Sequence, residues 1–435
     1  MIKEVIHNYW QSDLPEVFPR AIKLDLKSDL IIDIVGPRRA GKTYLMYDAI
    51  KEISRKAGRE ASIYLNFENR RLLPIQENYF NDIIEFIYAE GLLEKYGRVY
   101  LFLDEVQKIN GWEKYVRAIF DEFKGRIKIV VSGSNANLLS KDYGSLLTGR
   151  HLTVNVLPLS LKEILAFKKI EWQPGRQSEK AQSKIKKALS DYLKFGGFPE
   201  VVLEKNSAKK EEMLNQLFAD ILARDILSRE DTRRSNLLEE FSYILASNIS
   251  TLQSFNKMAK QFATRGLKIS ISTLENYFHL LKNAYLFFDH TIFSYKVKDQ
   301  LLYPRKIYAV DSGLVNLAGF KFSEDMGKFY ENIVADELLR RSFASANEKV
   351  FYWKGSEGRE VDFVVKKGIK IKKLIQVCYN LSATETKKRE VAALIESADA
   401  LKCGNLLIIT ADFEAEERIG GKKIVYAPLW KWLLE

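Results

Sequence analysis

The chain has 435 residues and a formal net charge of +11, with 46% hydrophobic and 29% charged residues. This length exceeds one ordinary hydrophobic core, so we expect roughly two to four globular domains. Two cysteines and four histidines exclude a disulfide framework and a cysteine zinc site. The first residues lack the apolar core of a signal peptide and no apolar run reaches membrane-spanning length, which predicts a cytoplasmic protein without a membrane partner.

The first segment with a chemical signature is 36–43, which reads GPRRAGKT and fills every fixed position of the P-loop pattern. It follows the apolar run 30–35, which has the composition of a buried strand, and precedes residues 44–56, which have apolar residues at helical spacing. Such a strand-to-helix turn aims backbone N–H groups and the positive end of a helix dipole at one point. The sequence therefore predicts a phosphate site, and a chance glycine-rich turn is the alternative.

The predicted cofactors are ATP and Mg²⁺. Lys42 is expected to reach the β- and γ-phosphates, and the Thr43 hydroxyl to hold Mg²⁺. The nucleotide-binding residues are the loop and the start of the following helix, namely Gly36, Pro37, Arg38, Arg39, Ala40, Gly41, Lys42, Thr43 and Tyr44.

Two further apolar strands are expected to deliver polar residues to the same site. The strand over 61–67 carries Asn66 near its end, where it either orients the acid that activates water or simply caps the strand. The strand over 99–103 is followed by Asp104 and Glu105. In a nucleotide site the first carboxylate holds Mg²⁺ through water and the second polarises the attacking water. Asp-Glu after four apolar residues is a weak signal alone and a strong one downstream of a P-loop.

Helices over 79–93 and 113–123 are expected to connect these strands, and residues 127–131 form a fourth one. This strand ends in Ser132-Gly-Ser-Asn. Ser134 or Asn135 then either faces the γ-phosphate or caps the next helix.

Together, GPRRAGKT, YLNFE, VYLFLDEVQKI, VVSGSNANLLS and SLLTGR followed by LPLSLKEIL resemble the AAA-type ATPases of archaea and bacteria that bear a C-terminal DUF4143 domain. The resemblance covers the whole chain. It implies an α/β fold with a RecA-like P-loop core, in which a parallel sheet lies between helices, and a sensor role for Asn135. Arg150 is the candidate for an arginine that meets a phosphate, in the same chain or in a neighbouring subunit, and a structural salt bridge is its alternative.

Four parts are expected along the chain: the P-loop core (1–158), a helical lid and bridge (159–235), a winged-helix domain (236–307), and a restriction-endonuclease-like C-terminal domain (308–435). In the bridge, Arg224 either approaches the nucleotide as a second sensor or pairs with Asp220 or Asp225.

The winged helix is predicted from helices over 237–248, 254–264 and 270–283, with wing strands over 284–291 and 305–309. Residues 251–310 contain nine Lys or Arg and three Asp or Glu, which is consistent with a DNA-binding surface. A generally basic protein has the same composition, and many winged helices bind proteins or only space domains. In the DNA-binding interpretation the groove is lined by Ser270, Ser272, Thr273, Asn276 and His279.

The C-terminal part places Glu331 on a helix, and Asp362 at the centre of a strand. A helix Glu, a strand Asp and a Glu-x-Lys on the next strand form the metal site of the PD-(D/E)xK nucleases. Here that last strand carries Gln376 and Cys378, which supply neither the carboxylate nor the ammonium. The sequence predicts no efficient nuclease, with Glu331 and Asp362 as a remnant metal site or as structural polar residues.

These patterns predict an ATPase with Lys42, Glu105, Asn135 and Arg150 as catalytic residues and Thr43 and Asp104 as metal ligands. Its nucleotide state is expected to be coupled to a C-terminal region that binds a partner or DNA. The first alternative is a nucleotide-switched regulator that binds a protein partner with little turnover. The second is an ATP-dependent nuclease, which Gln376 and Cys378 disfavour. An oligomer is compatible with all three.

Overall fold

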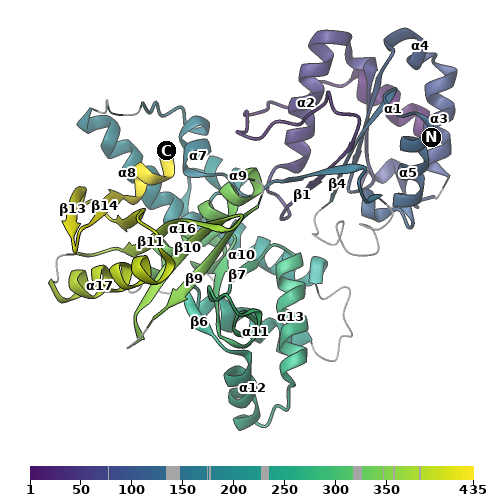
Figure 1. Ribbon diagram of the computed structural model, residues 1–435. Coiled ribbons are helices and arrows are strands. Elements are labelled where there is room, and N and C mark those ends of the chain that lie inside the picture. Colours follow the sequence, from purple (N-terminus) through teal and green to yellow (C-terminus); the bar gives the residue numbers. More distant parts are fainter. Residues whose placement is uncertain are drawn as a thin grey trace. The chain divides into compact units, whose positions relative to one another are not determined.

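The computed structural model describes residues 1–435 except 77, 134–146, 174, 176–177, 227–234, 317–325, 346, 356–357 and 382–383. The chain divides into two compact units, Met1–Leu157 and Pro158–Glu435 (Figure 1). In the described residues, no helix has the length and apolar character needed to cross a membrane.

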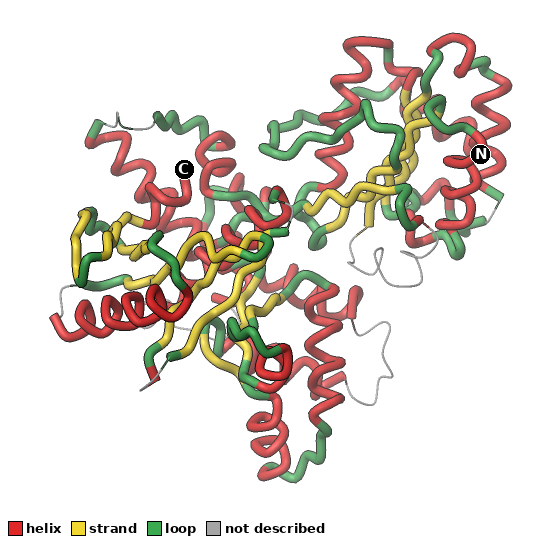
Figure 2. The backbone as a smooth tube through the Cα atoms, in the orientation of Figure 1, coloured by secondary structure: helices red, strands yellow, loops and turns green. Residues whose placement is uncertain are grey.

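The first unit is built on a five-stranded parallel sheet with the strand order β2-β3-β4-β1-β5. Its strands are β1 (Ile31–Val35), β2 (Ser62–Asn66), β3 (Val99–Asp104), β4 (Ile127–Gly133) and β5 (His151–Asn155). Figure 2 shows the strands between helices on either side. Because both faces of such a sheet are covered, its central strands are continuous buried runs, and every residue of β1 and β4 is buried. The predicted α/β fold with a parallel sheet is confirmed.

The helices of this unit are α1 (Ile2–Gln11), α2 (Lys42–Ala57), α3 (Tyr79–Ala89), α4 (Leu92–Tyr96) and α5 (Trp112–Glu122). The amphipathic helix predicted within 79–93, with its end at Gly91, corresponds to α3, which ends at Ala89, and a second short helix, α4, begins at Leu92. Gly91 between them is left-handed, with φ 59°, and this conformation breaks the helix.

The second unit begins with helices α7 (Leu161–Phe167), α8 (Glu179–Phe195), α9 (Pro199–Leu203) and α10 (Ser207–Asp220), followed by the π-helical segment η5 (Ile221–Ile226). Helix α7 starts in a capping box, in which Ser160 accepts from the Glu163 N–H and Glu163 accepts from the Ser160 N–H. In η5, Arg224 lies 4.0 Å from Asp220, which is the ion pair that the sequence offered as an alternative to a sensor role.

Helices α11 (Ser235–Ser247), α12 (Phe255–Thr264) and α13 (Ile271–Asn283) follow. They accompany a three-stranded antiparallel sheet of order β6-β8-β7, formed by β6 (Thr251–Gln253), β8 (Arg305–Ala309) and β7 (Phe287–His290). The three predicted helices and two predicted strands are confirmed as elements, and β6 is an addition. Two short helices, α14 (Val297–Leu302) and α15 (Ser312–Asn316), flank β8 in the chain.

The C-terminal region is a six-stranded mixed sheet of order β13-β14-β12-β11-β10-β9. Its strands are β9 (Glu348–Lys354), β10 (Glu360–Lys367), β11 (Lys370–Cys378), β12 (Leu406–Thr410), β13 (Ala415–Ile419) and β14 (Lys422–Pro428). Helices α16 (Met326–Ala344), α17 (Thr384–Leu401) and α18 (Leu429–Leu434) accompany it. One apolar core joins residues of α17 to residues of β10, β11, β12 and β14.

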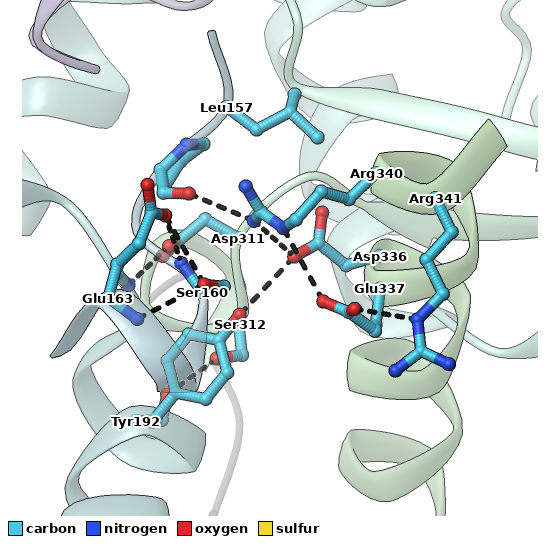
Figure 3. Close-up of polar contacts among 12 residues, drawn as sticks. Leu157, Ser160, Glu163, Tyr192, Asp311, Ser312, Asp336, Glu337, Arg340 and Arg341 are labelled. Atoms are coloured by element: carbon cyan, nitrogen blue, oxygen red, sulfur yellow. Dashed lines mark hydrogen bonds and ion pairs between the residues drawn. The ribbon is translucent and has the colours of Figure 1, made fainter. Parts of the chain in front are cut away.

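A buried polar network joins α16 to the start of the second unit (Figure 3). Arg340 donates to the carbonyl of Pro158 at 2.9 Å and lies 3.4 Å from Asp336. The hydroxyl of Tyr192 donates to the same Asp336 at 3.3 Å. Burial raises the pKa of Asp336 to about 7, while Arg340 opposes this shift. These contacts satisfy polar groups that would otherwise be costly to bury.

Candidate functional site

The loop between β1 and α2 closes around the ammonium group of Lys42. Its Nζ atom donates to the carbonyls of Gly36, at 3.0 Å, and Pro37, at 2.9 Å, and the residue is only 5% exposed. Gly41, left-handed with φ 97°, precedes the helix as its N-cap. A Cβ atom at Gly36 would lie 2.0 Å from the carbonyl oxygen of Val156, so this position requires glycine. The predicted strand, turn and helix therefore form a preshaped ring of backbone around one cation.

The two predicted metal ligands meet directly. The Thr43 hydroxyl donates to Asp104 Oδ2 at 2.6 Å, and Asp104 is fully buried at the end of β3. The same carboxylate accepts hydrogen bonds from the Tyr64 hydroxyl at 2.9 Å and from the Ser132 hydroxyl. Three neutral hydroxyl donors from α2, β2 and β4 thus converge on one carboxylate.

Tyr64 and Ser132 are site residues that sequence reasoning missed. Burial and the nearby Asp104 carboxylate raise the pKa of Tyr64 well above its ordinary value, so it remains a neutral donor. The available signal was position: both residues lie on strands that run parallel to β3 on either side of it, with Ser132 near the carboxyl end of β4 and Tyr64 in the middle of β2.

Glu105 follows in the left-handed conformation, with φ 54°. Its carboxylate accepts from Gln107 Nε2 at 2.6 Å. Burial raises the pKa of Glu105, whereas the Lys42 ammonium and the Gln107 hydrogen bond oppose that shift. Gln107 Oε1 is itself buried and finds no hydrogen-bond partner within the described part of the chain. Gln107, which sequence reasoning also missed, is thus the side chain that holds Glu105.

In the described residues, the side chain of Asn66 makes a local contact rather than a hydrogen bond to Glu105. Its side-chain oxygen accepts from the Glu68 N–H at 2.8 Å, which is the local strand-end turn that the sequence offered as its alternative role. The predicted sensor Asn135 lies outside the described residues, as does Ser134.

The remaining loop residues surround this centre. Arg38 is half-buried, and Arg39 and Tyr44 are exposed. The buried Arg20, which sequence reasoning missed because no motif marks it, donates to the carbonyls of Ala40 at 2.9 Å and Leu157 at 2.8 Å.

Arg150 lies near the amino ends of the sheet strands, whereas the P-loop lies at their carboxyl ends. Its carbonyl accepts from the N–H of Ile31 at the start of β1, whereas the loop begins after Val35 at the end of that strand. The strand separates them by roughly 15 Å, at about 3.3 Å per residue. The guanidinium lies 3.1 Å from Asp121. This placement does not support a contact between Arg150 and a phosphate bound by its own chain, and the ion pair with Asp121 agrees with the salt-bridge alternative.

At the predicted remnant metal site, a lysine ammonium lies between the two carboxylates. Glu331 and Asp362 do lie together, but both contact the ammonium of Lys306 from β8. Gln376 faces away from this ammonium and donates to Glu390 at 2.6 Å.

Three known domain families match consecutive parts of the chain: an AAA domain over residues 28–165, a domain of unknown function (DUF8612) over 186–324, and another (DUF4143) over 326–432. The uncharacterized protein MJ1544 of Methanocaldococcus jannaschii is 35% identical over 96% of this chain and 91% of its own length. An uncharacterized protein of Haemophilus influenzae is 30% identical over 93% of this chain and 94% of its own.

Among solved structures, the Walker-type ATPase PaBY2304 of Pyrococcus abyssi aligns with 66% of this chain and 90% of its own, at 16% identity and a TM-score of 0.43. That likeness carries no conclusion about activity. The family models and the two full-length relatives suffice: the chain belongs to the archaeal and bacterial family that joins an AAA-type P-loop ATPase domain to DUF8612 and DUF4143 domains.

Proposed function

We propose that this chain binds ATP with Mg²⁺ and hydrolyses it by attack of water on the γ-phosphate. The observation that carries the proposal is the 2.6 Å hydrogen bond between Thr43 and Asp104. It joins the first helical turn after the P-loop to the end of β3, where an NTPase holds its metal. Mg²⁺ bound by Thr43, with Asp104 acting through water, would neutralise charge on the phosphates.

Lys42 supports the same proposal because its hydrogen bonds to the loop are exchangeable. The carbonyls of Gly36 and Pro37 that accept from its ammonium are neutral. Phosphate oxygens make stronger, charge-assisted hydrogen bonds with an ammonium group. Lys42 therefore exchanges these carbonyls for the β- and γ-phosphates when nucleotide enters.

Glu105 is the proposed residue that orients the attacking water and accepts its proton. Burial moves the pKa of this carboxylate up towards neutral pH, and a general base works best when its pKa lies near the working pH. Gln107 holds this carboxylate with its amide N–H, and the buried Oε1 is left as an acceptor for water. We assign Gln107 as a positioning residue for Glu105.

Glu105→Gln tests the chemistry. We expect ATP affinity to be retained and the steady-state ATPase rate to fall by about 10² or more, because an amide cannot accept the proton. Glu68→Gln is the matched control, since this exposed neighbour pairs with Lys108 at the surface. An unchanged rate in Glu105→Gln removes Glu105 from this role.

We further propose that nucleotide state is transmitted from the loop to the point where the chain leaves the first unit. Gly36 packs against the carbonyl of Val156, and Arg20 joins the carbonyls of Ala40 and Leu157. A loop that changes shape around phosphate therefore moves groups bonded to residues 156–157. The second unit begins at Pro158.

For the partner, residues 236–307 are proposed to be a winged helix that contacts DNA. The supporting observation is a run of exposed basic and polar residues on α12, α13 and the turn between them, namely Lys257, Lys260, Arg265, Lys268, Ser272, Asn276 and His279. The alternative is a nucleotide-switched regulator that binds a protein through this surface.

ATPase rates with and without duplex or single-stranded DNA separate the two, with Lys42→Ala as the blank. A several-fold increase that weakens as salt rises favours DNA, because phosphate contacts release counterions. A real rate that is indifferent to DNA favours a protein partner.

The four-part division at residues 158, 235 and 307 also remains our proposal. The restriction-endonuclease-like description of 308–435 rests on a mixed sheet flanked by α16 and α17. For Arg150, we propose action only in a neighbouring subunit, since its own loop is out of reach.

A further inference from the structure

Lys306 is enclosed by three carboxylates, which we call the carboxylate cluster: Glu331 of α16, and Glu360 and Asp362 of β10. Its Nζ atom lies 3.0 Å from Glu331 Oε1, 2.6 Å from Glu360 Oε1 and 2.8 Å from Asp362 Oδ1. Lys306 is 3% exposed. An ammonium has three protons to donate, which matches the number of carboxylates that lie within 3.0 Å of this one.

Neutral donors satisfy other oxygen lone pairs of the carboxylate cluster. The Tyr308 hydroxyl donates to Glu331 at 2.9 Å, and the Val377 N–H donates to Asp362 Oδ2 at 2.9 Å. A buried carboxylate with such partners is held in one orientation. The cluster is thus a built and fully occupied polar site rather than a loose group of acidic residues.

We propose that the ammonium of Lys306 occupies the position a divalent cation would take between the helix Glu and the strand Asp, so that the carboxylate cluster is closed to metal. Three carboxylate oxygens that converge on one point are what a hard divalent cation requires. The distances of 2.6–3.0 Å belong to hydrogen bonds, whereas Mg²⁺–oxygen bonds measure about 2.0–2.1 Å. Across the described ranges, no group of three or more Asp, Glu, His or Cys side chains is arranged to hold a metal ion, and this includes the three carboxylates around Lys306.

The electrostatics of the site agree with this occupancy. Burial opposes the charge on Lys306, but Asp362, Glu331 and Glu360 outweigh it and raise its pKa well above the ordinary value. Burial and the neighbouring Asp362 raise the pKa of Glu331, which favours its protonated form. One cation facing the remaining carboxylates leaves little net charge for a second cation to neutralise.

The two β11 residues that stand where a nuclease has its Glu and Lys are Gln376 and Cys378, and in the described part of the chain neither takes part in a metal site. The Gln376 side chain accepts from the Asp362 N–H and donates to Glu390 of α17. Cys378 is a buried thiol whose pKa burial raises to about 11, so it stays neutral, and a thiol cannot replace the ammonium group of a lysine. The lysine that is present comes instead from β8. It ties the three-stranded sheet to α16 and β10, which gives the site a structural role within the second unit.

The test is binding of Mn²⁺ alone to the full chain without nucleotide, followed by electron paramagnetic resonance. Wild type and Asp362→Asn should bind the same amount of Mn²⁺, because the carboxylate cluster takes none. Lys306→Ala should gain one saturable site, and Lys306→Ala combined with Asp362→Asn should lose it. A wild-type Mn²⁺ site that disappears in Asp362→Asn overturns the proposal, as does a folded Lys306→Ala chain that gains no site.

Denaturant unfolding covers the case in which Lys306→Ala folds poorly. In EDTA this variant should unfold at lower denaturant than wild type, because three carboxylates are left without their cation. Mn²⁺ should restore its midpoint towards wild type while leaving the wild-type midpoint unchanged. Lys370→Ala, an exposed lysine on β11, should behave as wild type. A wild-type midpoint that Mn²⁺ raises through Asp362 contradicts the proposal. None of these measurements depends on ATP turnover.

Discussion

Two buried lysines in this molecule are held by opposite kinds of partner. Lys42 in the P-loop donates to two neutral backbone carbonyls. Lys306 in the second unit lies within 3.0 Å of three carboxylate oxygens. Both side chains are about equally buried, at 5% and 3% exposure. The difference between them therefore lies in the charge of their partners and not in their access to water.

The comparison explains why the Lys42 site can accept a ligand, whereas the Lys306 site has its charges already compensated. A carbonyl pair compensates an ammonium only partly, so an arriving phosphate improves the charge balance of the P-loop. Removing Lys306 from its carboxylates would instead leave uncompensated buried charge, at a cost of about 3–5 kcal/mol. We infer that Lys42, which donates to exchangeable carbonyls, is a binding group, and that Lys306, which lies among three carboxylates, is a structural cation.

The largest expected effect is that of Lys42→Ala on ATP turnover. We expect the steady-state rate to fall by about 10² or more, because the main positive charge facing the γ-phosphate is lost. Lys56→Ala is the matched control on the same helix, since Lys56 only pairs with Glu52 at the surface. If Lys42→Ala retained half of the activity, Lys42 would not be the phosphate-binding group that the comparison takes it to be.

A smaller effect is expected for Gln107→Ala, which removes the donor that holds Glu105. We expect kcat to fall roughly tenfold with an unchanged KM for ATP, in keeping with the loss of one hydrogen bond to a charged group. Because this bond lowers the pKa of Glu105, its loss should move the acid limb of the pH–rate profile to higher pH. Lys108→Ala, on the same turn, is the control. A rate loss without a shift of that limb would reduce Gln107 to a packing role.

A third effect concerns the pH dependence of stability at Lys306. Burial and Asp362 raise the pKa of Glu331 to about 8 in the folded chain, against 4.5 ordinarily. The folded chain thus keeps a proton that the unfolded chain releases, and the contribution of Glu331 to stability falls as pH rises from 4.5 to 8. Glu331→Gln keeps an acceptor for Lys306 and Tyr308 but cannot titrate.

We therefore expect the free energy of unfolding of Glu331→Gln, minus that of wild type, to increase across that pH range. Urea titrations at several pH values measure it. The buried His290, whose pKa burial lowers to about 3, is present in both chains and cancels in the difference. A difference that is flat or decreases with pH would mean that Glu331 is ionised beside Lys306.

Sequence reasoning found the residues of the candidate site that lie within local patterns. Lys42, Thr43, Asp104 and Glu105 follow strands whose apolar runs can be read directly, and parallel strands bring their carboxyl ends to one edge. Gln107 escaped notice because its role depends on a left-handed residue at Glu105, which no composition reveals. The distance of Arg150 from the loop could not be predicted, because it depends on the pairing register of β5 with β1.

The sequence by itself determined the P-loop and its carboxylate pair, the strands and helix that carry them, and the absence of a metal carboxylate and lysine at Gln376 and Cys378. These are local properties, set by periodicity, turn chemistry and side-chain type. Only the tertiary structure decided that Tyr64 and Ser132 hold Asp104, and that Lys306 fills the carboxylate cluster. Lys306 and Asp362 lie 56 positions apart in the chain. Long-range packing sets the meeting of such groups, and no local pattern encodes it.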